Sequence, residues 1–241
     1  AWNWDMGGSN ATNTTGDITS TVRANPTYGQ SIVSWSGSGT NNDTVGHGLS
    51  SAPEMVISKR RNNSTDQWAV YHASLGQGFL QLNTNDDYSS ATDRWGTNAP
   101  TDTVMNLGHA GSTNNGSGTY IAYCFHSVTG YSKFSSYSGS GSSGNTITTG
   151  FKPAFVMVKN ATTSGENWYV FDSTREPFGE LDTALKADEN NAETTSTTKK
   201  VEFTSTGFKL NSTNRALNHG DGDTYIYMAF ADKREYAYWL D

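Results

Sequence analysis

Ala52-Pro53-Glu54-Met55-Val56-Ile57-Ser58-Lys59 recurs 100 residues later as Lys152-Pro153-Ala154-Phe155-Val156-Met157-Val158-Lys159. Each stretch is a proline, a short apolar run and a closing lysine. A polar loop follows each copy and leads to Trp68-Ala69-Val70-Tyr71 or to Trp168-Tyr169-Val170-Phe171. Short runs rich in β-branched and aromatic residues, with proline at the start, are typical of β-strands. The sequence therefore predicts a duplicated all-β unit.

The spacing between the two copies indicates how they differ. The offset is 100 for Trp68 and Trp168, and it grows to 105 for Thr119 and Thr224. A small drift of this kind arises when loops change length and the core strands are kept. A period near 100 is the duplication of a domain-sized unit, which is longer than a solenoid repeat.

We predict three parts of the chain: an irregular arm rich in Gly, Asn and Thr (residues 1–28) and two closely packed β-sandwich-like repeats (residues 29–131 and 132–241), each with about seven strands. One lectin-like jelly-roll sandwich is the alternative, because about fourteen strands would also fill it. Trp2 and Trp4 would face one side of an extended arm, and we expect them to anchor it against a neighbouring domain.

Two further features bear on how the repeats are built. The strand that opens each copy occurs three times, around Ile32, Phe134 and Trp239. We therefore expect each copy to be closed by the strand that opens the next. Residues 181–187 have the spacing of a short helix, whereas the matching stretch of the first copy is typical of a strand, so both assignments stay open.

Composition excludes several classes of protein. The net charge is −7, and the only basic cluster is Lys59-Arg60-Arg61, which we interpret as a solvated loop flank, so nucleic acid is not an expected partner. No apolar run is long enough for membrane insertion. Cys124 is the single cysteine, expected as a buried thiol. The start of the chain lacks an initiator methionine and a signal peptide, which indicates a processed end or a cut from a longer chain.

No motif for catalysis is present, and we expect neither enzyme activity nor a cofactor. Glycoside hydrolysis needs two convergent carboxylates. Glu54 is the one carboxylate within a core strand, and Ala154 replaces it in the second copy, so a solvent-facing position explains it more simply. His47 is replaced by Thr149 and is interpreted as a turn residue. No metal site is predicted: Asp221 and Asp223 are the best calcium candidates, but a hairpin turn is the preferred interpretation.

Glycan binding needs exposed aromatic rings flanked by amides and carboxylates. The longest loop of the first copy offers Asp86, Asp87, Tyr88, Arg94 and Trp95 as candidate ligand-binding residues. The competing interpretation places Trp95 in the core, and we favour it slightly.

Several motifs together resemble a repeat domain of marine bacteriophage structural proteins, which themselves resemble tail fibres or other virion appendages. The resemblance covers nearly all of residues 29–236, in both copies. The first-copy motifs are specific as a set: Ser31-Ile32-Val33-Ser34-Trp35-Ser36-Gly37-Ser38-Gly39, Val45-Gly46-His47-Gly48-Leu49, residues 53–61, Trp68-Ala69-Val70-Tyr71-His72 and Tyr120-Ile121-Ala122-Tyr123-Cys124-Phe125.

This resemblance implies a virion location, with other virion proteins as partners and homo-oligomerisation, a trimer being one form. It also implies contact with a glycan or protein receptor on the host surface. The family has no established catalytic residues. A purely structural module, such as a capsid decoration or a fibre shaft segment, is the alternative. A polysaccharide depolymerase is least favoured, and it would need acids remote in sequence, with Glu166, Glu176 and Glu180 as candidates.

Overall fold

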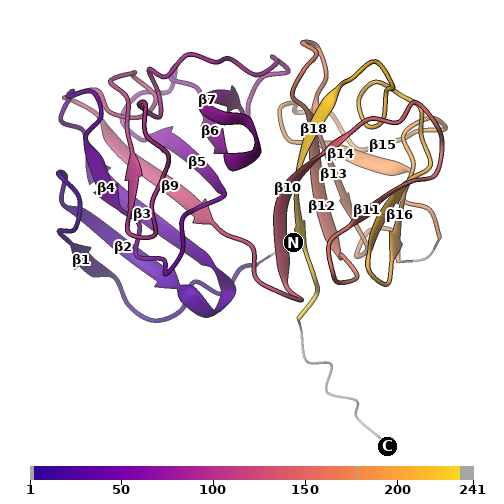
Figure 1. The fold of residues 1–241 in the computed structure, drawn as a ribbon, viewed down its shortest axis with the longest axis horizontal. Helices are drawn as coiled ribbons and strands as arrows, with labels where there is room; N and C mark the ends of the chain where they lie inside the picture. Colours follow the sequence, from indigo (N-terminus) through magenta and orange to yellow (C-terminus); the bar gives the residue numbers. More distant parts are fainter. Residues whose placement is uncertain (1–2, 178, 234–241) are drawn as a thin grey trace, which may run out of the picture.

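The first repeat is a two-sheet sandwich. The computed structural model describes residues 3–177 and 179–233. A seven-stranded antiparallel sheet faces a small sheet of β4 (Thr44–Gly46) and β8 (Val104–Asn106) (Figure 1). The order in the large sheet is β1 (Ala11–Asn13), β2 (Ser20–Asn25), β3 (Gln30–Ser36), β9 (Thr119–Phe125), β5 (Met55–Arg60), β6 (Ala69–His72) and β7 (Gly76–Gln81).

The second repeat is built in the same way. Its three-stranded sheet has the order β11 (Asn145–Thr148), β17 (Gly207–Leu210) and β16 (Val201–Thr204). Its large antiparallel sheet has the order β10 (Ser132–Ser138), β18 (Thr224–Phe230), β12 (Phe155–Asn160), β13 (Trp168–Asp172), β14 (Thr183–Lys186) and β15 (Thr194–Thr195). Short 3-10 helices occupy Pro26–Tyr28 and Ala73–Leu75.

Each sandwich has its own apolar core, so the all-β sandwich prediction is confirmed and the single jelly roll is wrong. In β9, Tyr120, Ala122 and Cys124 alternate into the first core. Cys124 is fully buried as expected, and burial raises the pKa of its thiol to about 12. A separate cluster that includes Val156 and Val158 fills the second core.

The outer faces of the two large sheets pack against each other and bury a third apolar cluster, which we call the seam (Figure 1). Strand β12 shows why its sequence has no polar alternation: Val156 and Val158 face the second core, while Phe155 and Met157 face the seam. The buried members of the seam are Met55, Ile57, Val70, Leu80, Phe125, Phe134, Phe155, Met157, Ala161, Trp168, Ile226, Met228 and Phe230.

Equivalent positions of the two repeats meet in the seam. Met55 and Phe155 have the same place in the two copies, as do Phe125 and Phe230. The contact is therefore isologous, like the interface of a twofold dimer, and such an interface closes on itself. Each repeat therefore buries the seam residues of the other.

In each repeat a buried asparagine makes the same hydrogen bonds to a Gly-Ser loop, at residues 37–40 in the first repeat and 139–142 in the second. The side-chain oxygen of Asn114 accepts a hydrogen bond from the Ser38 amide at 2.9 Å, and its Nδ2 donates to the Thr40 carbonyl at 2.8 Å. Asn218 makes the equivalent bonds to Ser140 and Ser142, both at 2.8 Å. Both asparagines are fully buried. These loops connect the two sheets of each sandwich, since residues 37–43 lead from β3 to β4 and residues 139–144 lead from β10 to β11.

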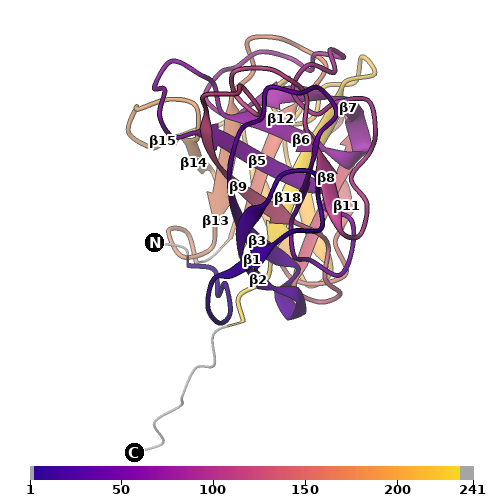
Figure 2. The ribbon, with the colours of Figure 1, turned by 90° about the vertical axis from the view of Figure 1, so that its left-hand side faces the viewer.

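Two expectations about the strands are wrong, and one assignment that the sequence left open is resolved. Residues 11–13 and 20–25 of the expected irregular arm form β1 and β2, which extend the large sheet beyond β3 (Figure 2). Residues 183–186 form strand β14, because they pair with β13. Strand β10 pairs with β18 of its own repeat, so the opening strand of the second repeat does not close the first. The third opening strand, around Trp239, and the anchoring residue Trp2 lie outside the described residues.

Candidate ligand-binding site

Residues 86–95, the loop in which the sequence predicted a ligand-binding site, do not act together, and Tyr88 contacts the second repeat. The Tyr88 hydroxyl accepts a hydrogen bond from the Gly78 amide at 2.9 Å. The backbone amide of Tyr88 donates a hydrogen bond to the Ala161 carbonyl across the seam, also at 2.9 Å, and the Tyr88 ring packs against the seam. Tyr88 thus fastens one repeat to the other.

Arg94 and Trp95 are also committed to packing. Trp95 is 2% exposed in the first core, beside the Tyr71 ring at 6.2 Å between centroids. This agrees with the favoured core interpretation and leaves no ring surface for a sugar. The Arg94 guanidinium lies 3.5 Å from the centre of the Phe79 ring and bonds both carboxylate oxygens of Asp93 at 3.0 Å. Of the five predicted residues, only Asp86 and Asp87 are fully exposed, so the five do not form one patch.

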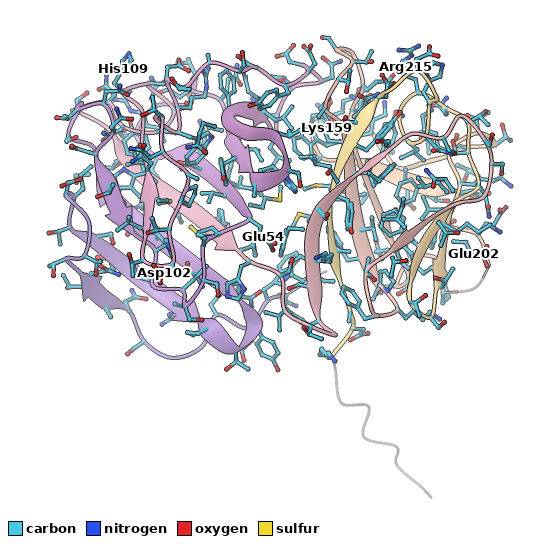
Figure 3. All side chains as sticks on the ribbon, viewed as in Figure 1. Glu54, Asp102, His109, Lys159, Glu202 and Arg215 are labelled. Carbon is cyan, nitrogen blue, oxygen red and sulfur yellow. The ribbon has the colours of Figure 1, made fainter. Side chains whose placement is uncertain are left out.

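The two calcium candidates, Asp221 and Asp223, already have hydrogen-bond or ion-pair partners within the protein. Asp223 is 3% exposed and accepts hydrogen bonds from Asn160 at 3.0 Å and Thr163 at 3.2 Å. Asp221 lies 3.6 Å from the Arg215 guanidinium, at the top of the second repeat (Figure 3). In the described part of the chain, no group of three or more His, Cys, Asp or Glu side chains could hold a metal ion.

Glu54 is not the solvent-facing residue we expected. It is half-buried near the middle of the molecule (Figure 3), and its carboxylate accepts a hydrogen bond from the Ser127 amide at 2.5 Å. Ser127 lies between β9 and β10, so Glu54 holds the connection between the repeats. Among the described residues, one connection of this kind joins the repeats, so the second copy does not need the carboxylate and has Ala154 at this position.

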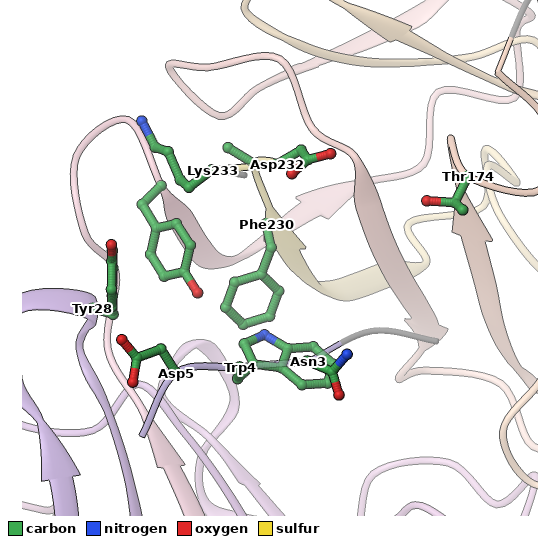
Figure 4. Close-up of a pocket in the computed structure, with 10 residues that line it drawn as sticks. Asn3, Trp4, Asp5, Tyr28, Thr174, Phe230, Asp232 and Lys233 are labelled. Carbon is green, nitrogen blue, oxygen red and sulfur yellow. The ribbon is translucent and has the colours of Figure 1, made fainter. Parts of the chain in front are cut away.

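A pocket of about 400 Å³ lies at one end of the seam (Figure 4). Residues from five separate parts of the chain surround it, and both repeats contribute. Its aromatic residues come from the N-terminal segment, the first 3-10 helix, the connection before β10 and the end of β18. The lining residues are Asn3, Trp4, Asp5, Tyr28, Tyr131, Thr174, Phe230, Ala231, Asp232 and Lys233.

Aromatic contacts form the floor of the pocket. The Trp4 ring meets Phe230 edge to face at 5.4 Å between centroids, and it meets Phe155 at 6.0 Å. Tyr28 packs against Tyr131 at 4.8 Å. The expectation that the arm is anchored holds for Trp4, which packs on residues of the second repeat. The same contacts also leave half-buried rings at the pocket wall.

Hydrogen bonds fix the N-terminal segment beside these rings. The Asp5 carbonyl accepts from Gln30 Nε2 at 2.6 Å and from Asn25 Nδ2 at 3.1 Å. The Asp5 carboxylate accepts from the Gly7 amide at 2.8 Å. Because Gln30 is fully buried, the segment has a fixed attachment point, and Asp5 is held at the pocket rim.

The pocket combines apolar ring surface with polar groups of both signs. Asp5 and Asp232 offer carboxylates, Asn3 an amide and Lys233 an ammonium group. Burial, helped by Tyr28 and Asp5, raises the pKa of Tyr131 to about 12, so its phenol remains protonated at neutral pH. Rings suit the apolar face of a sugar, and these polar groups suit its hydroxyls.

Sequence reasoning missed this pocket because its residues are scattered from residue 3 to residue 233. Trp4 was expected to anchor the arm, but nothing in the sequence singled out Tyr28 or Tyr131. The proximity of these residues follows only from the packing of the repeats, which brings the end of β18 beside the N-terminal segment.

The fold and pocket define a tandem β-sandwich protein with a ligand-sized pocket at the seam between its repeats. Over residues 1–234 the chain matches the family described as "Domain of unknown function (DUF7483)", and it belongs to that family. No curated protein and no solved structure matches the chain. No helix in the described part of the chain has the length and apolarity to cross a membrane.

Proposed function

We propose that the chain is a non-enzymatic structural module of a bacteriophage virion, a tail-fibre or appendage domain, that contacts a glycan on the host surface through the seam pocket. The observation that carries the glycan contact is the pairing of half-buried aromatic rings with the carboxylates of Asp5 and Asp232 in one pocket. The virion assignment is supported by the sequence resemblance to marine phage appendage proteins.

The size and setting of the pocket support a small saccharide ligand. Its volume falls within the range of about 300–1,000 Å³ typical of small-molecule sites. Trp4 and Tyr131 each already pack against Phe230, so few side chains need to be ordered when a ligand binds. Preorganisation of this kind lowers the entropic cost of binding.

A polysaccharide depolymerase is the second candidate, because Asp5 and Asp232 line the same pocket. Glycoside hydrolysis also needs a general acid in a setting that keeps it protonated. Asp5 is exposed and lacks such an apolar enclosure. Glu176 accepts hydrogen bonds from the backbone amides of Asp182 and Thr183, and Glu180 forms an ion pair with Lys200. Neither acid lines the pocket. Binding without cleavage is therefore the better supported function.

Calorimetric titration with oligosaccharides from envelope polysaccharides of marine bacteria tests the pocket. We expect Tyr28→Ala to weaken binding about tenfold, since stacked rings contribute about 1 kcal/mol or more. Asp5→Asn should also weaken it, while the exposed Asp102→Asn, remote in the first repeat (Figure 3), should not. Saccharide binding that is unchanged in Tyr28→Ala and Asp5→Asn would place the glycan elsewhere. Binding only to other virion proteins would favour a purely structural module.

A further inference from the structure

We propose a second ligand site, for an extended anionic polysaccharide, on the open face of the large sheet of the first repeat, between Arg23 and Arg61. This site does not depend on the seam pocket, with which it shares no lining residue. Two adjoining hollows of about 360 and 320 Å³ form a groove there, and both include Thr21, Ser34 and Arg61.

The strand register explains how the groove arises. Thr21 lies opposite Ser34, and Ser34 opposite Ile121, in a row across β2, β3 and β9. Arg23 lies opposite Ile32 in the next row of the same face. Side chains alternate along a strand, so this is also the face from which Phe125 enters the seam. The second repeat covers this face over β5, β6 and β9, and β1 and β2 extend it beyond that cover.

Arg61 is fixed by the sheet although it follows β5. Its amide donates to the Thr119 carbonyl at 2.7 Å, which continues the ladder between β5 and β9 by one residue. Its side chain lines both hollows, whereas Arg23 lines one of them, at the other end of the row. The two guanidinium groups therefore lie at separate points of a single groove.

The two arginines of the groove differ from the other arginines that the structure describes. Arg60, Arg94, Arg175 and Arg215 each lie within ion-pair distance of a carboxylate. Arg23 and Arg61 are exposed, and neither guanidinium has a hydrogen bond or ion pair with a described residue. No acidic residue is among those that line the two hollows. In a chain of net charge −7, two unpaired arginines in one groove indicate an anionic ligand.

The surface between the arginines indicates which anion fits. Thr21 and Ser34 present hydroxyl groups, and Ile32 and Ile121 present half-buried apolar surface. A polysaccharide with carboxylate or sulfate groups along its length matches charges at both ends and hydroxyls between them. An acidic peptide would instead add to a strand edge, because the backbone groups on this face are already paired in the sheet. Two arginines are too few for a nucleic acid backbone.

Affinity measurements with two charged probes and one neutral probe test the site. The probes are a polyuronate and a sulfated galactan, with a dextran of equal length as the neutral control. We expect the wild-type chain to bind at least one charged probe at 20 mM salt, to bind it less at 300 mM, and to leave dextran unbound. The double variant Arg23→Gln with Arg61→Gln should lose about tenfold or more in affinity, as two charge-assisted contacts disappear.

Matched controls separate this site from general charge and from the seam pocket. Lys152→Gln removes an exposed positive charge outside the groove and should leave the affinity for the charged probe unchanged. Tyr28→Ala alters the seam pocket and should also leave it unchanged. The proposal is overturned if neither charged probe binds, if dextran binds equally well, or if the double variant, folded by circular dichroism, binds like the wild type.

Discussion

The Nε1 of Trp168 donates a hydrogen bond to the backbone carbonyl of Gln81 at 2.9 Å, and this bond joins the second repeat to the first. Trp168 is 1% exposed, so its ring is enclosed by both repeats. Its first-repeat counterpart, Trp68, is only half-buried. The duplicated tryptophan therefore has a structural task in the seam that its counterpart does not share.

Replacing this tryptophan tests the seam. We expect Trp168→Phe to lower the free energy of unfolding by about 2–3 kcal/mol, because a buried hydrogen bond is lost and a cavity forms. Thermal unfolding followed by circular dichroism measures the effect. Trp68→Phe is the matched control and should cost clearly less. Equal losses for the two variants would show that the seam places no special demand on Trp168.

Acid should weaken the protein through His72. Burial lowers the pKa of this imidazole to about 4 from an ordinary 6.5, and the neighbouring backbone of Tyr227 opposes the shift. The unfolded chain therefore binds the proton more readily, so the free energy of unfolding falls as the pH drops from 6.5 towards 4, by up to about 3 kcal/mol.

Denaturant unfolding at pH 7 and pH 4.5 measures this dependence. His72→Gln should reduce the loss of stability between the two pH values, whereas His109→Gln, an exposed control, should retain it. An unchanged pH dependence in His72→Gln would assign the acid sensitivity to other groups.

Lys159 closes the repeated octapeptide and should be more important to stability than Lys59. Lys159 lies near the top of the second repeat (Figure 3) and is fully buried, and its ammonium group donates to the carbonyls of Asn160 at 2.9 Å and Glu166 at 2.7 Å. We expect Lys159→Met to cost about 2–4 kcal/mol in chemical unfolding, since buried carbonyls lose their donor. Lys59→Met, at a half-buried site, should cost less. A reversed order would contradict this assignment.

The buried asparagines that hold the Gly-Ser loops, Asn114 and Asn218, should be necessary for the stability of both repeats. Removing the Asn218 amide in Asn218→Ala leaves the Ser140 amide and the Ser142 carbonyl without their partner. We expect a loss of about 2–3 kcal/mol, and a similar loss for Asn114→Ala. Faster hydrogen exchange should appear at 139–142 in the first variant and at 37–40 in the second. Exchange spread evenly over both repeats would argue against local clamps.

Sequence patterns predicted the strands and the duplication because the apolar runs after Pro53 and Pro153 are short and repeat with little drift. They also favoured the core for Trp95. The seam was not evident, because a strand buried on both faces, such as β12, shows an unbroken apolar run (residues 155–158) with no alternation to tell one face from the other. Strands β1 and β2 have many polar residues and form through pairing with β3.

The site was predicted less well than the fold. Loop composition drew attention to Asp86–Trp95, yet packing uses most of that loop. The rings of the seam pocket come from residues 4, 28, 131 and 230, and only the contact between repeats assembles them. Spacing within a sequence carries no information about a site that forms across such a contact.

Retention of host envelope polysaccharide by the wild-type chain, with release of reducing ends followed in the same sample, tests the central claim most directly. The claim predicts that polysaccharide is retained, that no reducing ends appear, and that Tyr28→Ala weakens the retention of an uncharged polysaccharide, for which the groove between Arg23 and Arg61 has no charge to pair. Release of reducing ends would contradict it and identify Asp5 and Asp232 as the acids to study. Absence of retention across a broad panel of marine hosts would equally contradict a glycan-binding role.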